Sequence, residues 1–196
     1  MDQPRTLRDK TEIERRRTLL DQPHMAELRD FARKLRNRSF GSIPDFDPLD
    51  GGENAQALFL LEKPGPRAFL SGFISRNNND CTAEATFRFM EQANVPRNTT
   101  LLWNVMPGWD GARKYVIGDL KIGSDVLPEL LEMLPKLKVI VCVGEAARKA
   151  FSHIKIDTFP VLTSLHPSPI NRASRFGEWS MIPIHWAKVL TFMELP

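Results

Sequence analysis

Four short apolar segments between residues 57 and 165 constrain the fold more than any other feature of the sequence. They are Ala57–Leu61, Thr100–Asn104, Lys138–Val143 and Phe159–Leu165. Such nearly unbroken apolar runs are typical of strands that are covered on both faces. Helical patterns lie between and after them, at residues 81–94, 123–134, 145–152 and 184–193. This alternation predicts right-handed crossovers and an α/β fold with a parallel sheet between helices.

The N-terminal part of the chain has a different pattern. The capping-box pattern of Thr11–Glu14 predicts a helix with Thr11 at its N-cap, and apolar residues recur at helical spacing over Met25–Leu35. Residues 39–54 lose that periodicity and are rich in Gly, Pro and Asp, which predicts a loop. We predict that residues 1–54 pack as basic helices and a loop on an α/β domain, residues 55–196, in one compact unit.

The composition excludes several kinds of protein. Cys81 and Cys142 lie far apart, so neither a disulfide framework nor a cysteine-based zinc or four-cysteine iron–sulfur site is supported. The 4 histidines lack the spacing of metal ligands, and we expect no metal and no cofactor. The charged N-terminus is unlike a secretory signal, and the apolar runs are too short to cross a bilayer. We expect a reduced, cytoplasmic monomer that does not bind membranes.

The net charge of +3 is unevenly distributed. Residues 1–40 carry a net charge of +4, residues 41–147 of −4 and residues 148–196 of +3. A basic head and tail could bind a polyanion. Solvated charged helices explain the same distribution, and on charge alone we favour this second interpretation.

Polar residues follow the predicted strands directly. Glu62 and Lys63 follow the first strand, Asn104 ends the second, Gly144 follows the third and His166 follows the fourth. The carboxyl ends of parallel strands share one edge, where open α/β sheets bind ligands. We therefore expect Glu62, Asn104 and His166 to converge on a site. The sequence has no glycine-rich nucleotide fingerprint and no G-x-S-x-G hydrolase elbow.

Three of these turns resemble motifs of the uracil-DNA glycosylase superfamily. His166–Ile170 (HPSPI) resembles its HPSPL loop, Leu101–Val105 (LLWNV) resembles its LLLNAV strand, and Glu62–Gly65 (EKPG) takes the place of its first motif, GQDPY or GEAPG-like. Arg172–Gly177 extends the likeness, whose order and spacing agree over residues 55–195. The resemblance implies a three-layer α/β/α sandwich with a central four-stranded parallel sheet. It also implies a DNA glycosylase that flips out uracil or a related deaminated base and hydrolyses its N-glycosidic bond, with DNA as the partner.

The resemblance assigns roles to single residues. Asn104 would read the uracil edge, because an amide offers both a donor and an acceptor to O4 and N3–H; otherwise it satisfies backbone at the strand end. His166 would donate to O2 as negative charge builds on the leaving base; otherwise it is a buried, hydrogen-bonded histidine. Phe73 would stack on the flipped base and Ile170 would fill the vacated stack, or either residue belongs to the core.

The remaining candidates belong to two loops. Pro64 and Gly65 would contact the base from the first motif. Four residues of the last loop would hold DNA, namely Ser168, Pro169, Arg172 and Arg175, of which the serine and the arginines would contact phosphates.

Lys63 departs from the pattern of the superfamily. The resemblance places a water-orienting aspartate there in strongly active members. A protonated lysine cannot accept a proton, and it would repel the cationic sugar of the transition state. One unit charge at about 4 Å and an effective dielectric constant near 20 costs about 4 kcal/mol, which corresponds to roughly a thousandfold in rate.

Several hypotheses follow from Lys63. In the first, Lys63 points away and pairs with Glu62 or another acid, and Glu62 orients the water. Glu62 is thus our first choice for the catalytic group. Second, the protein is a catalytically impaired member of the fold that binds DNA or a free base. Third, a neutral Lys63 is a base or a nucleophile that forms an imine with the sugar. An unrelated small-molecule enzyme of doubly wound type is a further alternative.

Overall fold

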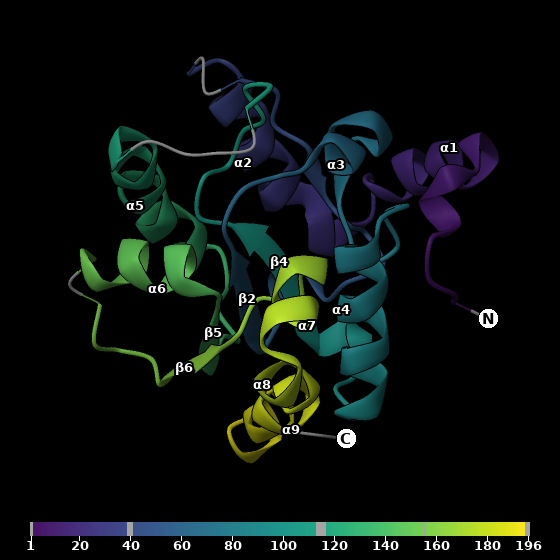
Figure 1. Ribbon diagram of the computed structural model, residues 1–196. Helices are drawn as coiled ribbons and strands as arrows, with labels where there is room; N and C mark the ends of the chain where they lie inside the picture. The colour runs from purple at the N-terminus through teal and green to yellow at the C-terminus, as the bar shows by residue number, and fades with distance from the viewer. Residues whose placement is uncertain (1, 39–40, 113–116, 155, 195–196) are drawn as a thin grey trace.

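A parallel sheet forms the centre of the protein in the computed structural model, which describes residues 2–38, 41–112, 117–154 and 156–194 (Figure 1). Its strands are β2 (Ala57–Leu61), β4 (Thr100–Asn104), β5 (Val139–Val143) and β6 (Val161–Ser164). They lie in the order β4-β2-β5-β6, and every neighbouring pair is parallel. The predicted four-stranded parallel sheet is therefore confirmed. A second, two-stranded sheet pairs β1 (Asp45–Phe46) with β3 (Phe73–Ile74).

Helices surround this sheet. The α-helices are α1 (Lys10–Leu19), α2 (Ala26–Arg36), α3 (Pro66–Ser71), α4 (Cys81–Gln92), α5 (Ile117–Glu132), α6 (Glu145–Ser152), α7 (Pro169–Ser174), α8 (Phe176–Ser180) and α9 (Ile182–Ala187). Short 3-10 turns lie at Thr6–Arg8, Pro23–Met25, Gly52–Asn54, Arg97–Thr99 and Lys188–Thr191. Within the ranges that the structure describes, no helix is both long and apolar enough to span a membrane.

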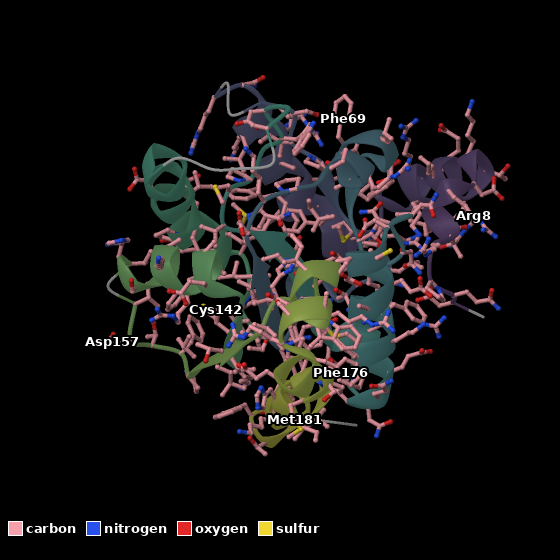
Figure 2. All side chains as sticks on the ribbon, viewed as in Figure 1. Arg8, Phe69, Cys142, Asp157, Phe176 and Met181 are labelled. Carbon is pink, nitrogen blue, oxygen red and sulfur yellow. The ribbon has the colours of Figure 1, made fainter. Side chains whose placement is uncertain are left out.

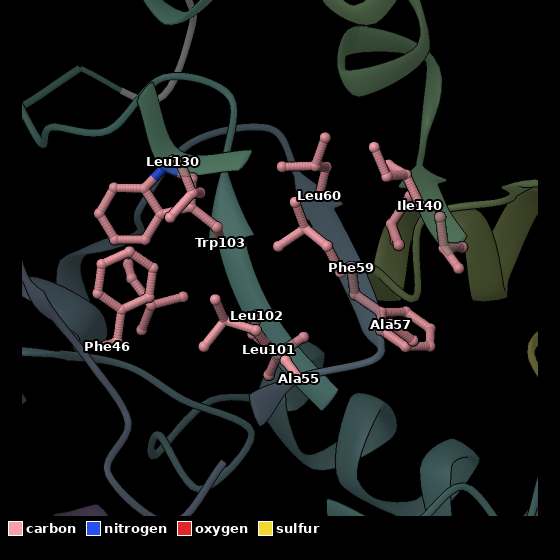
Figure 3. Packing of buried hydrophobic residues seen from close by; sticks show 14 of the residues in the cluster. Phe46, Ala55, Ala57, Phe59, Leu60, Leu101, Leu102, Trp103, Leu130 and Ile140 are labelled. Carbon is pink, nitrogen blue, oxygen red and sulfur yellow. The ribbon is translucent and has the colours of Figure 1, made fainter. Parts of the chain in front are cut away.

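Aromatic side chains mark the face of the sheet that the N-terminal segment covers. Trp103 of β4 stacks on Phe46, with 4.0 Å between ring centroids (Figure 3). Phe31 of α2 packs against the same tryptophan at 6.1 Å. All three side chains are buried. The amphipathic stripe of α2 therefore covers this face of the sheet.

The opposite face is covered by α4 and α9. Neighbouring residues of a strand point to opposite faces, and Leu60 pairs with Trp103, so Phe59 faces away from α2. Phe59 contacts Trp186 of α9 edge-on at 5.2 Å, and Phe89 of α4 reaches the same tryptophan at 6.1 Å. Helices on both faces make the molecule a three-layer α/β/α sandwich.

The predicted elements agree closely with the observed ones. The bounds of β2, β4 and α6 are those predicted, whereas β6 is shorter than predicted at both ends. The segment predicted as a loop, residues 39–54, contains the short strand β1 and a 3-10 turn. The predicted helix at 184–193 is divided into α9 and a 3-10 turn.

Two helix starts were wrongly predicted. The N-cap of α1 is Asp9, whose carboxylate accepts from the N–H of Thr11 at 2.9 Å, because the helix begins one residue before Thr11. Helix α5 begins at Ile117, not at residue 123. Gly123 weakens the helical signal, yet it is needed there. A Cβ at Gly123 would lie 1.9 Å from the carbonyl oxygen of Val105, so the glycine permits a close approach to the loop after β4.

A buried ion pair fastens α1 to the rest of the molecule. Arg16 is fully buried, and its guanidinium pairs with Asp47 and, at 2.9 Å, with Glu12. It also donates to the side chain of Asn77 at 3.1 Å. A single hydrophobic cluster contains residues from α2, β1 and the central sheet. The boundary between residues 54 and 55 stays a prediction.

Candidate active site

A cavity of about 510 Å³ lies at the carboxyl ends of β2 and β4. Its wall is formed by the first-motif loop with α3, by the segment 74–86, by the strand ends and by the turn after β6. The lining residues are Leu61, Lys63, Pro64, Gly65, Pro66, Arg67, Ala68, Ile74, Ser75, Arg76, Asn78, Asp80, Cys81, Thr82, Ala83, Thr86, Leu102, Asn104, His166 and Pro169. The edge predicted to bind a ligand is thus hollow, and it holds Asn104 and His166 together.

Asn104 is the last residue of β4 and is buried, with 4% of its surface exposed. The strand positions it, because its backbone pairs in register with Leu61 of β2. Its side-chain amide makes no hydrogen bond with any residue that the structure describes. A buried amide on a cavity wall, without such a partner, keeps both a donor and an acceptor for a ligand.

His166 follows β6 and is held by tight packing against the turn after β5. A Cβ on Gly144 would lie 3.0 Å from the Cβ of His166, and Gly144 has a φ of +91°, so both space and backbone favour glycine there. The N–H of Ser168 and the side-chain amide of Asn171 both donate to the His166 carbonyl at 2.8 Å. Burial lowers the pKa of His166 to about 4. The imidazole is therefore neutral near pH 7 and can donate one N–H to a ligand.

Lys63 lines the cavity and pairs with an acid from another loop. Its Nζ lies 2.6 Å from a carboxylate oxygen of Asp110, and only 6% of the lysine side chain is exposed. The ammonium also lies 5.9 Å from the centre of the Trp109 ring. The hydrogen bond from Lys63 lowers the pKa of Asp110. The lysine charge is thus balanced by Asp110.

Glu62 and Phe73 lie outside the cavity wall. Glu62 is half-buried, its carbonyl accepts from the N–H of Met106 at 3.0 Å, and burial raises the pKa of its carboxyl group. Phe73 lies in β3 and is 1% exposed, within the hydrophobic core. This placement agrees with a core residue rather than a stacking surface. The next residue, Ile74, lines the cavity instead, because alternate residues of a strand face opposite ways.

The comparison with protein-family models agrees with this geometry. Residues 53–184, about two thirds of the chain, match the model of the uracil DNA glycosylase superfamily. The chain belongs to this superfamily. A search of curated proteins gives no match.

Ser168, Pro169 and Ile170, which are predicted to bind DNA, follow the cavity residue His166 closely in the chain. Ser168 caps α7 by accepting from the N–H of Asn171 at 3.3 Å, and Pro169 lines the cavity. Ile170 is 77% exposed, which excludes the core alternative for this side chain. An exposed apolar side chain beside the cavity fits a wedge that enters a base stack.

The two arginines of this loop differ in their contacts. Arg172 lies over the ring of Trp179, with 5.3 Å from its guanidinium carbon to the ring centre. Arg175 forms an ion pair with Glu178, which lowers the pKa of that glutamate. Binding of a phosphate by Arg175 would therefore compete with Glu178.

Sequence reasoning missed the polar wall formed by residues of the segment Ser75–Asp80. Arg76 is 3% exposed and donates to the Thr100 hydroxyl at 2.6 Å, while its Nε has no partner among the described residues. Asn78 donates to the Phe73 carbonyl at 2.9 Å. The run of polar residues before a helix could have been recognised as a capped turn. Its sequence does not indicate which side chains enter a cavity.

Buried ion pairs support this wall from behind. Arg97 binds Asp47 at 2.6 Å and Asp50 at 2.9 Å, and Asp47 also binds Arg16 and the hydroxyl of Ser75. Burial alone would raise the pKa of Asp47, but the guanidinium groups of Arg97 and Arg16 hold it below its ordinary value. Asp47 is therefore ionised at neutral pH and anchors the segment that continues into the cavity wall.

In the parts of the chain that are described, no three His, Cys, Asp or Glu side chains gather where they could hold a metal ion. Cys81 is exposed and lines the cavity, while burial raises the pKa of Cys142 to about 12. Cys142 is thus a protonated, apolar core residue at neutral pH.

Proposed function

We propose that this protein is a DNA base-excision glycosylase that removes uracil or a related deaminated base. Membership of the superfamily supports a glycosylase-like function on DNA. The observation that carries the proposal is the meeting of Asn104 and a neutral His166 in one cavity at the carboxyl edge of the sheet. Flipping a base out of the duplex costs a few kcal/mol, and the flipped base must then be recognised in a pocket of this kind.

In the proposed reaction, the protein reads the base on one side and stabilises its departure on the other. Asn104 donates to O4 and accepts from N3–H of uracil. His166 donates its N–H to O2, where negative charge develops as the glycosidic bond breaks. Pro64 and Gly65 form part of the wall near the base, and Ile170 occupies the space that the base leaves in the duplex.

Lys63 is compatible with this chemistry because it is paired. Without a partner, the ammonium group of Lys63 would repel the positive charge that develops on the sugar. The carboxylate of Asp110, which lies 2.6 Å from the Lys63 Nζ, carries the opposite charge and therefore reduces that repulsion. Since the Nζ of Lys63 is paired with Asp110, imine formation, which needs a free amine, is the least favoured of the catalytic hypotheses. Glu62 would need to turn towards the cavity to orient a water molecule, because its side chain does not line it.

The experiment that tests this proposal measures strand cleavage. Purified full-length protein is incubated with end-labelled oligonucleotides that carry uracil, single-stranded or as U·G pairs, and then heated in alkali. We expect cleavage at the uracil, and its loss in Asn104→Ala excludes a contaminating glycosylase. Equal cleavage by the wild type and Asn104→Ala would contradict the role of Asn104.

A binding protein without catalysis is the second candidate function. Lys63 at the position of the aspartate, and Glu62 outside the cavity wall, favour this alternative. It predicts salt-sensitive DNA binding without product. In that case the double variant Lys63→Asp/Asp110→Asn, which restores one carboxylate without creating a repelling pair, should gain excision. If the folded double variant also stays inactive, Lys63 is not the cause of the inactivity.

A further inference from the structure

The proposed hydrolysis needs a carboxylate near the sugar, and the first motif does not supply one. Three acidic residues lie near enough to consider. Glu62 is outside the cavity wall, and Asp110 is engaged with Lys63 and with the N–H of Ala112 at 2.8 Å. Asp80 differs from both, since it is the only carboxylate among the described residues that line the cavity.

The backbone places Asp80 at the N-cap of α4, and residues of α4 line the cavity together with Pro169 of α7. One carboxylate oxygen, Oδ1, accepts from the N–H of Ala83 at 2.9 Å and so fixes the side chain as the N-cap of the helix. Within the described residues, the other oxygen makes no hydrogen bond. The side chain is half-buried. One oxygen is therefore held and the other remains able to accept.

We propose that Asp80 is the catalytic carboxylate of this protein and orients the attacking water, an inference that rests on the proposed function. The water oxygen forms a bond to C1′ of the deoxyribose while the C1′–N bond breaks and leaves its electron pair on the base. The water proton passes to the Asp80 carboxylate, and the base takes a proton from solvent. The ionised carboxylate also stabilises the cationic sugar, which Lys63 alone would destabilise.

The capping role of Asp80 permits a sharp test. Asparagine caps helices as well as aspartate does, so Asp80→Asn removes the charge and keeps the cap. Asp9→Asn is the matched control, because Asp9 caps α1 in the same way but does not line the cavity. The measurements are single-turnover excision of uracil, affinity for DNA that carries a stable abasic-site analogue, and the melting temperature.

We expect Asp80→Asn to slow excision by about 100-fold or more while affinity for the abasic DNA and the melting temperature stay unchanged, and Asp9→Asn to have no effect. Excision by Asp80→Asn at the wild-type rate would overturn the role of Asp80 but leave the glycosylase function standing. Parallel losses of excision, affinity and melting temperature in Asp80→Asn would assign it a structural role only. A wild-type protein that binds DNA but excises nothing would overturn both proposals.

Discussion

The two sides of the cavity relate differently to the superfamily. On the side of β6 and α7, the HPSPI turn resembles the superfamily loop; burial keeps His166 neutral and Ile170 is exposed, as their proposed roles in base release and wedge insertion require. On the side of the first motif and α4, Lys63 stands where the resemblance implies an aspartate, and residues of the polar wall Ser75–Asp80 line the cavity while Phe73 lies in the core. In the proposed reaction, the groups that contact the base therefore follow the resemblance, whereas the groups that orient the water and face the sugar charge differ from it.

The largest expected effect concerns the buried ion pairs behind the polar wall, Ser75–Asp80. Asp47→Ala leaves Arg16 and Arg97 without their shared carboxylate, and removing one partner of a buried pair costs about 3–5 kcal/mol. Urea unfolding followed by circular dichroism measures this loss. The control is Asp21→Ala, which breaks an exposed pair with Arg29 and should cost less than about 1 kcal/mol. Similar losses in both variants would show that the wall does not depend on these pairs.

A change at His166 tests the side of the cavity formed by β6 and α7. His166→Ala should reduce excision by about 10²–10³-fold, as expected when one donor to a developing anion is removed. Affinity for DNA with an abasic-site analogue should stay nearly intact, because the base has already left that ligand. Fluorescence anisotropy and single-turnover kinetics measure the two quantities. An equal loss of both would remove His166 from the chemical step.

The low pKa of His166 also predicts how stability depends on pH. An unfolded histidine binds a proton below its ordinary pKa of 6.5, whereas folded His166 does so only near pH 4. Between these values the unfolded state binds more protons, so a falling pH favours unfolding. The wild type should lose up to about 3 kcal/mol from this group between pH 6.5 and pH 4.

Urea unfolding of the wild type and of His166→Gln at pH 7 and pH 4.5 isolates this contribution. The variant lacks the titrating group and should lose less stability over the same interval. Identical losses in the two proteins would mean that burial does not hold His166 neutral.

The smallest expected effect concerns the wedge. Ile170→Ala should slow excision from a U·G duplex by roughly tenfold, since the vacated stack is then unfilled. Single-stranded DNA has no such stack, so excision from it should change little. Ile184→Ala, at an exposed apolar residue of α9, is the control. Phe69 on α3 and Phe176 on α8 are also exposed, and Figure 2 shows them at separate places on the surface. Exposure alone therefore does not define a wedge. Equal slowing on both substrates would contradict the wedge role.

The sequence predicts the sheet well, and it also predicts that Asn104 and His166 meet at one edge of that sheet. Buried parallel strands need continuous apolar runs, so β2 and β4 stand out, and Asn104 and His166 follow directly from strand ends. Phe73 could not be placed in the same way, because one residue along a strand changes the face to which a side chain points. The partner of Lys63 lies 47 residues away in a loop without periodicity. The cavity position of Asp80 depends on how α4 packs, which no local pattern encodes.

Release of the free base is the measurement that tests the central claim most directly. Full-length protein is incubated with duplexes that contain uracil, hypoxanthine or xanthine, and the filtrate is analysed by mass spectrometry. We predict that at least one deaminated base appears as the free base, and that His166→Ala greatly reduces its release. No free base from any of the three duplexes, with folded protein that binds them, would contradict the claim and favour a binding function.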